Sequence, residues 1–169
     1  METIIFPGFS LKNKNWSEDI QSGLGPTIPT IMVSWTHWET GNAESDWIEK
    51  ETQRVVGLIK DKKVNILAKS IGTAIAMGVI EQKPELVNKV VLCGIPVLDF
   101  VLGDEKRYAV LKPFSADKVL CIQNNADNHG SYAEAKKFLH SSNPSLKIIS
   151  KPRSDHEYPY LEEFMNFLR

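Results

Sequence analysis

The sequence has little net charge, few cysteines and no long apolar run, and each shortage excludes a class of protein. Its 169 residues carry a formal net charge of only −1, so there is no basic field to attract nucleic acid or an anionic membrane. No run reaches the roughly 18 consecutive apolar residues that a membrane-spanning helix needs. The first residues, 1–6, lack the basic start and long apolar core of a signal peptide. We therefore expect no membrane span and a cytoplasmic location.

Ligands for metals and phosphate groups are also scarce. The two cysteines, Cys93 and Cys121, each lie within an apolar run, which favours buried strand positions over a disulfide or a metal pair. The four histidines are scattered and show no metal-ligand spacing. The glycine-rich phosphate loops G-x-G-x-x-G and G-x-x-x-x-G-K-[ST] are absent. The sequence therefore predicts neither a metal nor an organic cofactor.

What the chain does contain is an alternation of short apolar runs and longer amphipathic segments, over a length that suits a single domain, 1–169. Strands are predicted at residues 3–6, 30–34, 65–69, 89–93, 118–123 and 147–150. Helices are predicted at residues 16–22, 45–60, 72–82, 131–140 and 160–168. Most of the strands are continuous β-branched and aliphatic runs, typical of strands covered on both faces. The pattern favours an α/β fold: a doubly wound, mostly parallel six-stranded sheet with helices on both faces.

One turn between a predicted strand and a predicted helix has the features of a nucleophile elbow. The strand ends at Ser70, with Ala68 two residues before the serine and Gly72 two residues after it. This matches G-x-S-x-G with alanine at the first glycine. Small residues are needed there because the strained serine backbone brings neighbouring side chains close. Ser70 is thus a candidate nucleophile; the alternative is that it only caps the helix.

An acid and a histidine follow the last two predicted strands. Asp127 lies after the fifth strand and His156 after the sixth. Because parallel strands place their carboxyl ends at one edge of a sheet, we expect both loops to lie near Ser70. The chain order Ser…Asp…His is that of the α/β-hydrolase triad and differs from the orders in the chymotrypsin and subtilisin folds.

With these residues the chain resembles the small single-domain α/β-hydrolases, the serine-hydrolase type to which the retinoblastoma-binding-protein-like hydrolases belong. The resemblance covers nearly the whole chain and rests on segments 68–72, 119–127 and 154–158. The six strands are similar to the family's third to eighth, without its first two strands and its large lid. The resemblance implies an oxyanion hole made by the backbone N–H groups of Ile71 and of Phe9, in the loop after the first strand.

Each proposed role has an alternative. His156 would take the proton of Ser70, since imidazole titrates close to physiological pH, or it is a surface histidine that caps the last helix. Asp127 would orient His156, or it forms only an Asx turn in a loop rich in asparagine. Asp99, after the fourth strand, is the alternative acid.

Aromatic residues and a lysine stand near the predicted strand ends. The aromatic residues that are candidates for lining an apolar acyl pocket are Phe9, Trp35, Trp38 and Tyr158. Simple packing is the alternative for them. Lys69, directly before Ser70, is expected either to contact an anion or carboxylate or to be a solvated side chain.

The sequence therefore predicts a hydrolase that cleaves a carboxylic ester, or a thioester or amide, through an acyl-serine intermediate. The excursion at 96–114 is too short for a large lid, so we expect an open cleft and a small or surface-presented acyl substrate. One alternative is a hydrolase-fold interaction protein with little activity, suggested by Ala68 and by tryptophans that look exposed, namely Trp35, Trp38 and Trp47. A second alternative is acyl transfer by the same three residues. Neither the acyl chain length nor the oligomeric state follows from the sequence.

Overall fold

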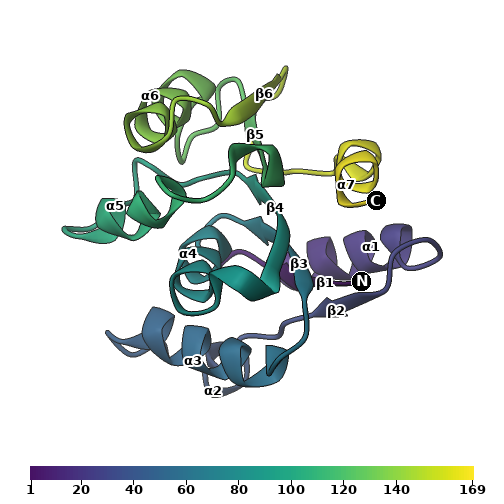
Figure 1. Cartoon of the computed structure of the whole chain (residues 1–169). Helices are drawn as coiled ribbons and strands as arrows, with labels where there is room; N and C mark the ends of the chain where they lie inside the picture. Colours follow the sequence, from purple (N-terminus) through teal and green to yellow (C-terminus); the bar gives the residue numbers. More distant parts are fainter.

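A computed structural model describes the whole chain, residues 1–169, and contains one six-stranded sheet in which every paired strand is parallel. The strand order is β2-β1-β3-β4-β5-β6 (Figure 1). The strands are β1 (Glu2–Phe6), β2 (Thr30–Met32), β3 (Val64–Lys69), β4 (Val87–Cys93), β5 (Val119–Asn124) and β6 (Lys147–Lys151). The predicted six-stranded parallel sheet is confirmed.

The five predicted helices are present, together with short helices that were not predicted. The α-helices are α1 (Asn13–Leu24), α2 (His37–Thr40), α3 (Trp47–Ile59), α4 (Gly72–Gln82), α5 (Asp104–Arg107), α6 (Tyr132–Ser142) and α7 (Leu161–Leu168). Three 3₁₀ turns complete the set: η1 (Pro84–Leu86), η2 (Tyr108–Leu111) and η3 (Ala116–Lys118). The four-residue helices α2 and α5 are too short to show a helical period in the sequence.

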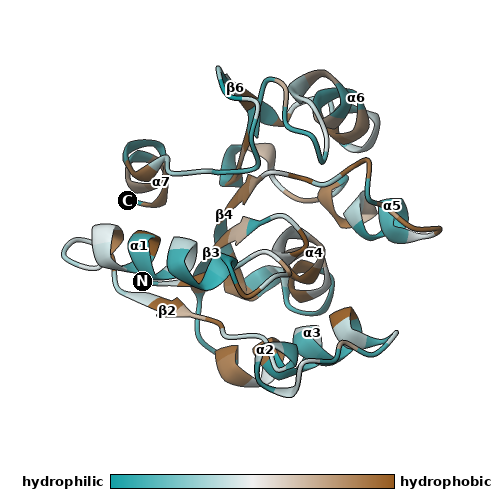
Figure 2. Ribbon diagram, turned by 180° about the vertical axis from the view of Figure 1, so that it is seen from behind, coloured by the Kyte–Doolittle hydropathy of each residue, from teal (hydrophilic) through white to brown (hydrophobic).

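Helices cover both faces of the sheet, as predicted (Figures 1 and 2). On one face α3, α4 and α6 pack over the larger apolar cluster, which includes Ile66 and Ala68 of β3. On the other face α1 and α7 pack over a smaller cluster, which includes Leu67. All six residues of β3 are buried. Covering on both faces explains why the central strands are continuous apolar runs instead of alternating ones.

Both cysteines are buried in central strands and are not joined to each other, as predicted. Burial raises the pKa of the Cys93 thiol and raises the pKa of Cys121 to about 12. Neither side chain is therefore a thiolate at neutral pH, which leaves them without the usual nucleophilic chemistry of cysteine. No helix in the structure combines the length and the apolar character needed to cross a membrane.

The order of the strands creates a crevice at one point of the sheet. The chain goes from β1 to β2 on one side and then returns to β3 on the other side of β1. The loops after β1 and β3 therefore leave the sheet in opposite directions, and ligands of open α/β sheets bind at such a switch point. From these two loops, Phe9 and Ser10 after β1 and Ser70 and Ile71 after β3 line one cavity.

Candidate active site

The elbow at Ser70 has the strained backbone that the sequence predicts. Ser70 has φ of 56°, in the left-handed region that non-glycine residues seldom adopt. Its amide donates to the carbonyl of Cys93 in the neighbouring strand (3.0 Å). Its side chain does not cap α4, because Ile71 holds the N-cap position and makes no side-chain cap bond. The Ser70 hydroxyl is thus free of the capping role that was its alternative explanation.

The glycine two residues after the serine allows a close backbone approach. A Cβ atom on Gly72 would lie 2.6 Å from the carbonyl oxygen of Phe6 and 2.7 Å from that of Pro7. These backbone atoms cannot move aside as a flexible side chain could. Glycine therefore brings the loop after β1 close to the loop that carries Ser70.

The alanine two residues before the serine belongs to the core. Ala68 is fully buried in the apolar cluster beneath α4. Its carbonyl accepts a weak hydrogen bond from the Cys93 thiol (3.3 Å). The positive φ falls on Ser70 and not on Ala68, so an L-residue is tolerated at this position. The departure from the glycine pattern is thus compatible with the elbow geometry.

We expect Ala68→Gly to lower stability while leaving kcat of the predicted ester hydrolysis unchanged. Glycine in place of alanine within a strand lowers the free energy of unfolding by about 0.5–1 kcal/mol, because the unfolded chain gains conformational freedom. Thermal unfolding and kcat for a p-nitrophenyl ester, measured on both proteins, check this. A kcat more than tenfold below the parent's would mean that the Ala68 methyl shapes the site.

His156 and Asp127 are joined by a hydrogen bond between the loops after β6 and β5. His156 Nδ1 lies 2.7 Å from Asp127 Oδ2, and the Asp127 side chain is fully buried. The same oxygen accepts from the Tyr158 hydroxyl (2.5 Å), and Oδ1 accepts from the His129 amide (2.8 Å). The bond from His129, two residues on, is the Asx turn considered above. Asp127 therefore does both things that were considered as alternatives: it forms the Asx turn and it contacts His156.

The surroundings of Asp127 favour its charged form. Burial by itself raises the pKa of this carboxyl, but hydrogen bonds from His156, Tyr158 and the His129 amide outweigh it and hold the pKa below its ordinary value. A carboxylate only accepts, so Nδ1 of His156 carries the proton. Nε2 of His156 is buried and has no hydrogen-bond partner, so Ser70 does not hydrogen-bond to it in this structure.

Asp99, the alternative acid, contacts a different histidine. Its Oδ2 lies 2.5 Å from Nδ1 of His129. The His129 ring packs against the His156 ring, with 4.3 Å between the ring centroids. Two histidine–carboxylate pairs therefore stand side by side, and Asp127 belongs to the pair that contains His156. The second pair was not predicted.

Several of the candidate residues line one cavity of about 330 Å³. Ser70 and Ile71 of the elbow, Phe9 of the loop after β1, and His156 all line it. Asp127 lies behind His156 and does not line the cavity. The remaining lining residues are Ser10, Asn13, Pro96, Asp99 and His129.

The loop that carries Phe9 is held by its carbonyl groups. The Phe9 carbonyl accepts from Trp38 Nε1 (2.7 Å) and lies 2.7 Å from His37 Nε2. The Gly8 carbonyl accepts from Trp35 Nε1 (3.1 Å). The amides of Phe9 and Ile71 donate to no other backbone group. Neither N–H group predicted for the oxyanion hole is therefore taken up by a backbone hydrogen bond.

Of the two explanations for the four aromatic residues, packing within the protein holds for three and pocket lining for one. Trp35 and Tyr158 are fully buried, and Trp38 lines neither this cavity nor its neighbour. Only Phe9 lines the cavity at Ser70. The other three hold the Gly8–Phe9 loop or the Asp127 carboxylate instead, because their polar ring atoms find partners within the protein.

An asparagine that the sequence analysis missed holds the histidine loop. The side-chain nitrogen Nδ2 of Asn124 donates to the backbone carbonyls of Asp155 and Glu157, both at 2.8 Å. These residues stand on either side of His156. Two amide side chains in a row, Gln123 and Asn124, at the end of a strand whose first four residues are apolar are the signal that could have indicated this role.

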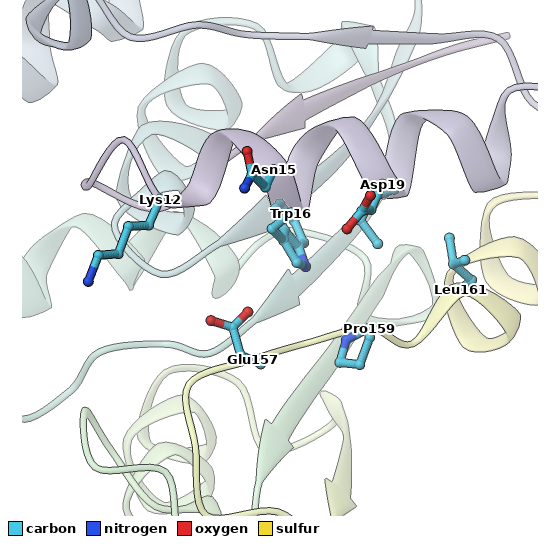
Figure 3. Close-up of a pocket in the computed structure, with 8 residues that line it drawn as sticks. Lys12, Asn15, Trp16, Asp19, Glu157, Pro159 and Leu161 are labelled. Atoms are coloured by element: carbon cyan, nitrogen blue, oxygen red, sulfur yellow. The ribbon is translucent and has the colours of Figure 1, made fainter.

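Lys69 is buried and contacts a carboxylate, which is one of its two predicted alternatives. Its side chain is 2% exposed, and Nζ lies 3.2 Å from Oε2 of Glu157. The ammonium also lies 5.3 Å from the ring centre of Trp16, whose Nε1 donates to the Tyr158 carbonyl (3.0 Å). Figure 3 shows Trp16 on α1 beside Glu157 and the chain that follows it. The pair thus links the residue before Ser70 to the residue after His156.

The shallow pocket in Figure 3, of about 300 Å³, lies between α1 and this segment. None of Ser70, Asp127 and His156 lines it. It is therefore separate from the candidate active site.

Comparisons with solved structures identify the fold. No protein-family model and no curated protein matches the sequence. The structure is similar to that of LipS and LipT, two metagenome-derived lipolytic enzymes, with a TM-score of 0.75 and 11% identity, over 99% of this chain and 92% of that chain. It is also similar to Est1E of Butyrivibrio proteoclasticus with bound ferulic acid (TM-score 0.73, 13% identity, 99% and 86% covered). Mouse alpha/beta hydrolase domain-containing protein 10 matches with a TM-score of 0.71 and 10% identity over 98% and 86%. The chain has the α/β-hydrolase fold.

Proposed function

We propose that this protein is a serine hydrolase that cleaves a carboxylic ester through an acyl-serine intermediate. The observation that carries the proposal is the pairing of His156 with the buried Asp127 beside a cavity that also contains Ser70 on its strained turn. A histidine that lines the same cavity as a serine supplies the activation that an unassisted hydroxyl lacks, once its Nε2 comes within hydrogen-bond reach of the serine oxygen. The fold agrees with this chemistry but does not by itself imply it.

In the proposed mechanism Ser70 Oγ attacks the ester carbonyl while Nε2 of His156 accepts its proton. Asp127 stabilises the imidazolium that forms, and the oxyanion accepts hydrogen bonds from the Phe9 and Ile71 amides. The carbon–oxygen bond to the alcohol breaks, and His156 returns the proton to the leaving oxygen. A water molecule then attacks the acyl-serine by the same route, releasing the acid and restoring Ser70.

The alternatives have less support. Trp35 is fully buried and Trp47 is 6% exposed, so two of the tryptophans that suggested an interaction surface offer little surface to a partner. Thioester cleavage, amide cleavage and acyl transfer would use the same three residues, so the rates on esters, thioesters and amides decide among them. The narrower resemblance to the retinoblastoma-binding-protein-like hydrolases stays a prediction.

Labelling with a fluorophosphonate tests the proposal directly. The reagent modifies serines that are activated by a base, so we expect one covalent adduct, which peptide mass spectrometry places on Ser70. Ser10 lines the same cavity and serves as the internal comparison. An unlabelled protein, or an adduct on Ser10 and not on Ser70, would contradict the proposed nucleophile.

A further inference from the structure

Three aromatic side chains after β2 donate hydrogen bonds to two successive peptide groups of the loop after β1. Trp35 Nε1 donates to the Gly8 carbonyl (3.1 Å). The Phe9 carbonyl accepts from Trp38 Nε1 and from His37 Nε2, each at 2.7 Å. Because a carbonyl only accepts, this nitrogen of His37 carries the proton. Both carbonyls therefore point toward the chain that follows β2.

The direction of the Gly8 carbonyl sets the direction of the next amide. This carbonyl and the Phe9 N–H belong to the same trans peptide group, in which the C=O and the N–H point in opposite directions. Holding the carbonyl against Trp35 thus turns the Phe9 N–H away from Trp35. Phe9 lines the cavity that contains Ser70, whereas Trp35 does not. The N–H predicted for the oxyanion hole is therefore aimed by the Trp35 hydrogen bond.

The same hydrogen bond strengthens the amide as a donor. A bond accepted by a carbonyl polarises its peptide group, and linked hydrogen bonds strengthen one another by roughly 10–30% each. Trp35 is fully buried, which keeps water from competing for the bond. Donors that are already in place when charge develops on the substrate oxygen usually make the largest single contribution to acyl-transfer catalysis. Trp35 thus affects both the aim and the strength of the Phe9 N–H.

A buried carboxylate that the proposed mechanism does not use holds this tryptophan in place. Glu51 of α3 is 1% exposed and accepts from the backbone N–H of Thr36 (2.9 Å) and from its hydroxyl (2.6 Å). Arg54, one turn further along α3, donates to the same carboxylate and to the Ser34 carbonyl, both at 2.8 Å. Ser34 and Thr36 stand on either side of Trp35. The turn that presents Trp35 is therefore fixed by α3 and not by the loop that it contacts.

We infer that Trp35 is a positioning residue for ester hydrolysis, which directs and polarises the Phe9 N–H for the oxyanion of the tetrahedral intermediate. This role rests on the proposed function and deepens it. It accounts for a fully buried tryptophan whose one polar atom is bonded to the loop after β1. The indole acts through the peptide group and does not touch the substrate.

Trp35→Phe tests this role, because it removes the indole N–H and keeps an aromatic ring in the core. Loss of a whole oxyanion-hole donor costs about 10²–10³ in kcat, but here the donor remains in a weaker and less well aimed form, so we expect kcat for p-nitrophenyl acetate to fall about tenfold. KM should change less than about twofold, since the affected interaction develops only in the transition state. The rate of fluorophosphonate labelling should also fall about tenfold, because the phosphoryl oxygen takes the place of the oxyanion.

Trp47→Phe is the matched control. Trp47 is 6% exposed and packs edge-to-face on Trp35, with 5.5 Å between the ring centroids, but its Nε1 has no hydrogen-bond partner. The substitution therefore makes the same change of ring in the same apolar cluster without removing a hydrogen bond. Its kcat and labelling rate should stay within about twofold of the parent's. Equal losses in the two variants would assign the effect to packing and overturn the role of the hydrogen bond.

Thermal unfolding of both variants accompanies the kinetics. If Trp35→Phe does not fold, replacement of Trp35 by 3-benzothienylalanine, in which sulfur takes the place of the N–H in a ring of similar shape, should give the same losses. A parent that reacts, together with a folded Trp35 variant whose kcat and labelling rate lie within about threefold of it, would reject the positioning role alone. A parent that neither hydrolyses the ester nor reacts with the fluorophosphonate would reject the proposed function, and the role of Trp35 with it.

Discussion

Replacing Ser70 with alanine should reduce kcat for a short p-nitrophenyl ester by at least about a thousandfold while leaving the fold intact. The substitution removes the oxygen that attacks the carbonyl, and the loss of one triad member typically costs several orders of magnitude in rate. It removes no hydrogen bond that holds the elbow, because those bonds are made by the Ser70 backbone. Steady-state hydrolysis and circular dichroism on the parent and the variant check the two parts of the expectation.

Ser141→Ala is the matched control, since Ser141 is exposed at the end of α6, far along the chain from the elbow. It should retain the parent's rate. A Ser70→Ala protein whose activity lies within about tenfold of the parent's would disprove the nucleophile assignment, because that difference amounts to only about 1.4 kcal/mol of barrier.

Asp127→Asn should lower kcat by about 10⁴, and Asp99→Asn should lower it much less. Only Asp127 contacts His156, so only its amide replacement can hold the imidazole in the wrong tautomer. Asp99 contacts His129, which packs against His156 without sharing a hydrogen bond with it. Hydrolysis of one ester by the two variants, prepared side by side, makes the comparison.

Asp127 also accepts hydrogen bonds from Tyr158 and the His129 amide, so its replacement affects structure as well as charge. Thermal unfolding of both variants therefore belongs to the experiment, and a folded Asp127→Asn protein at the assay temperature is required for the kinetic comparison. Greater damage from Asp99→Asn in folded protein would assign the acid to the loop after β4.

The sequence by itself determined the strands, the longer helices and the place of the elbow. These features depend on local causes: continuous apolar runs are needed for strands covered on both faces, and small residues are needed around a strained turn. The sequence shows the small residues Ala68 and Gly72 on either side of Ser70. It also shows that Asp127 and then His156 follow Ser70, and neither observation requires knowledge of a contact. They were sufficient to predict the parallel sheet and the edge at which the candidate residues meet.

The tertiary structure alone decided which side chains meet at that edge. Asp99 and Asp127 both follow central strands, and only the distances between loops show that one carboxylate contacts His129 and the other contacts His156. The burial of Lys69 against Trp16 and Glu157 arises in the same way, from side chains that are far apart in the sequence. Local pattern does not encode such contacts, because they depend on how neighbouring strands and loops pack once the sheet has formed.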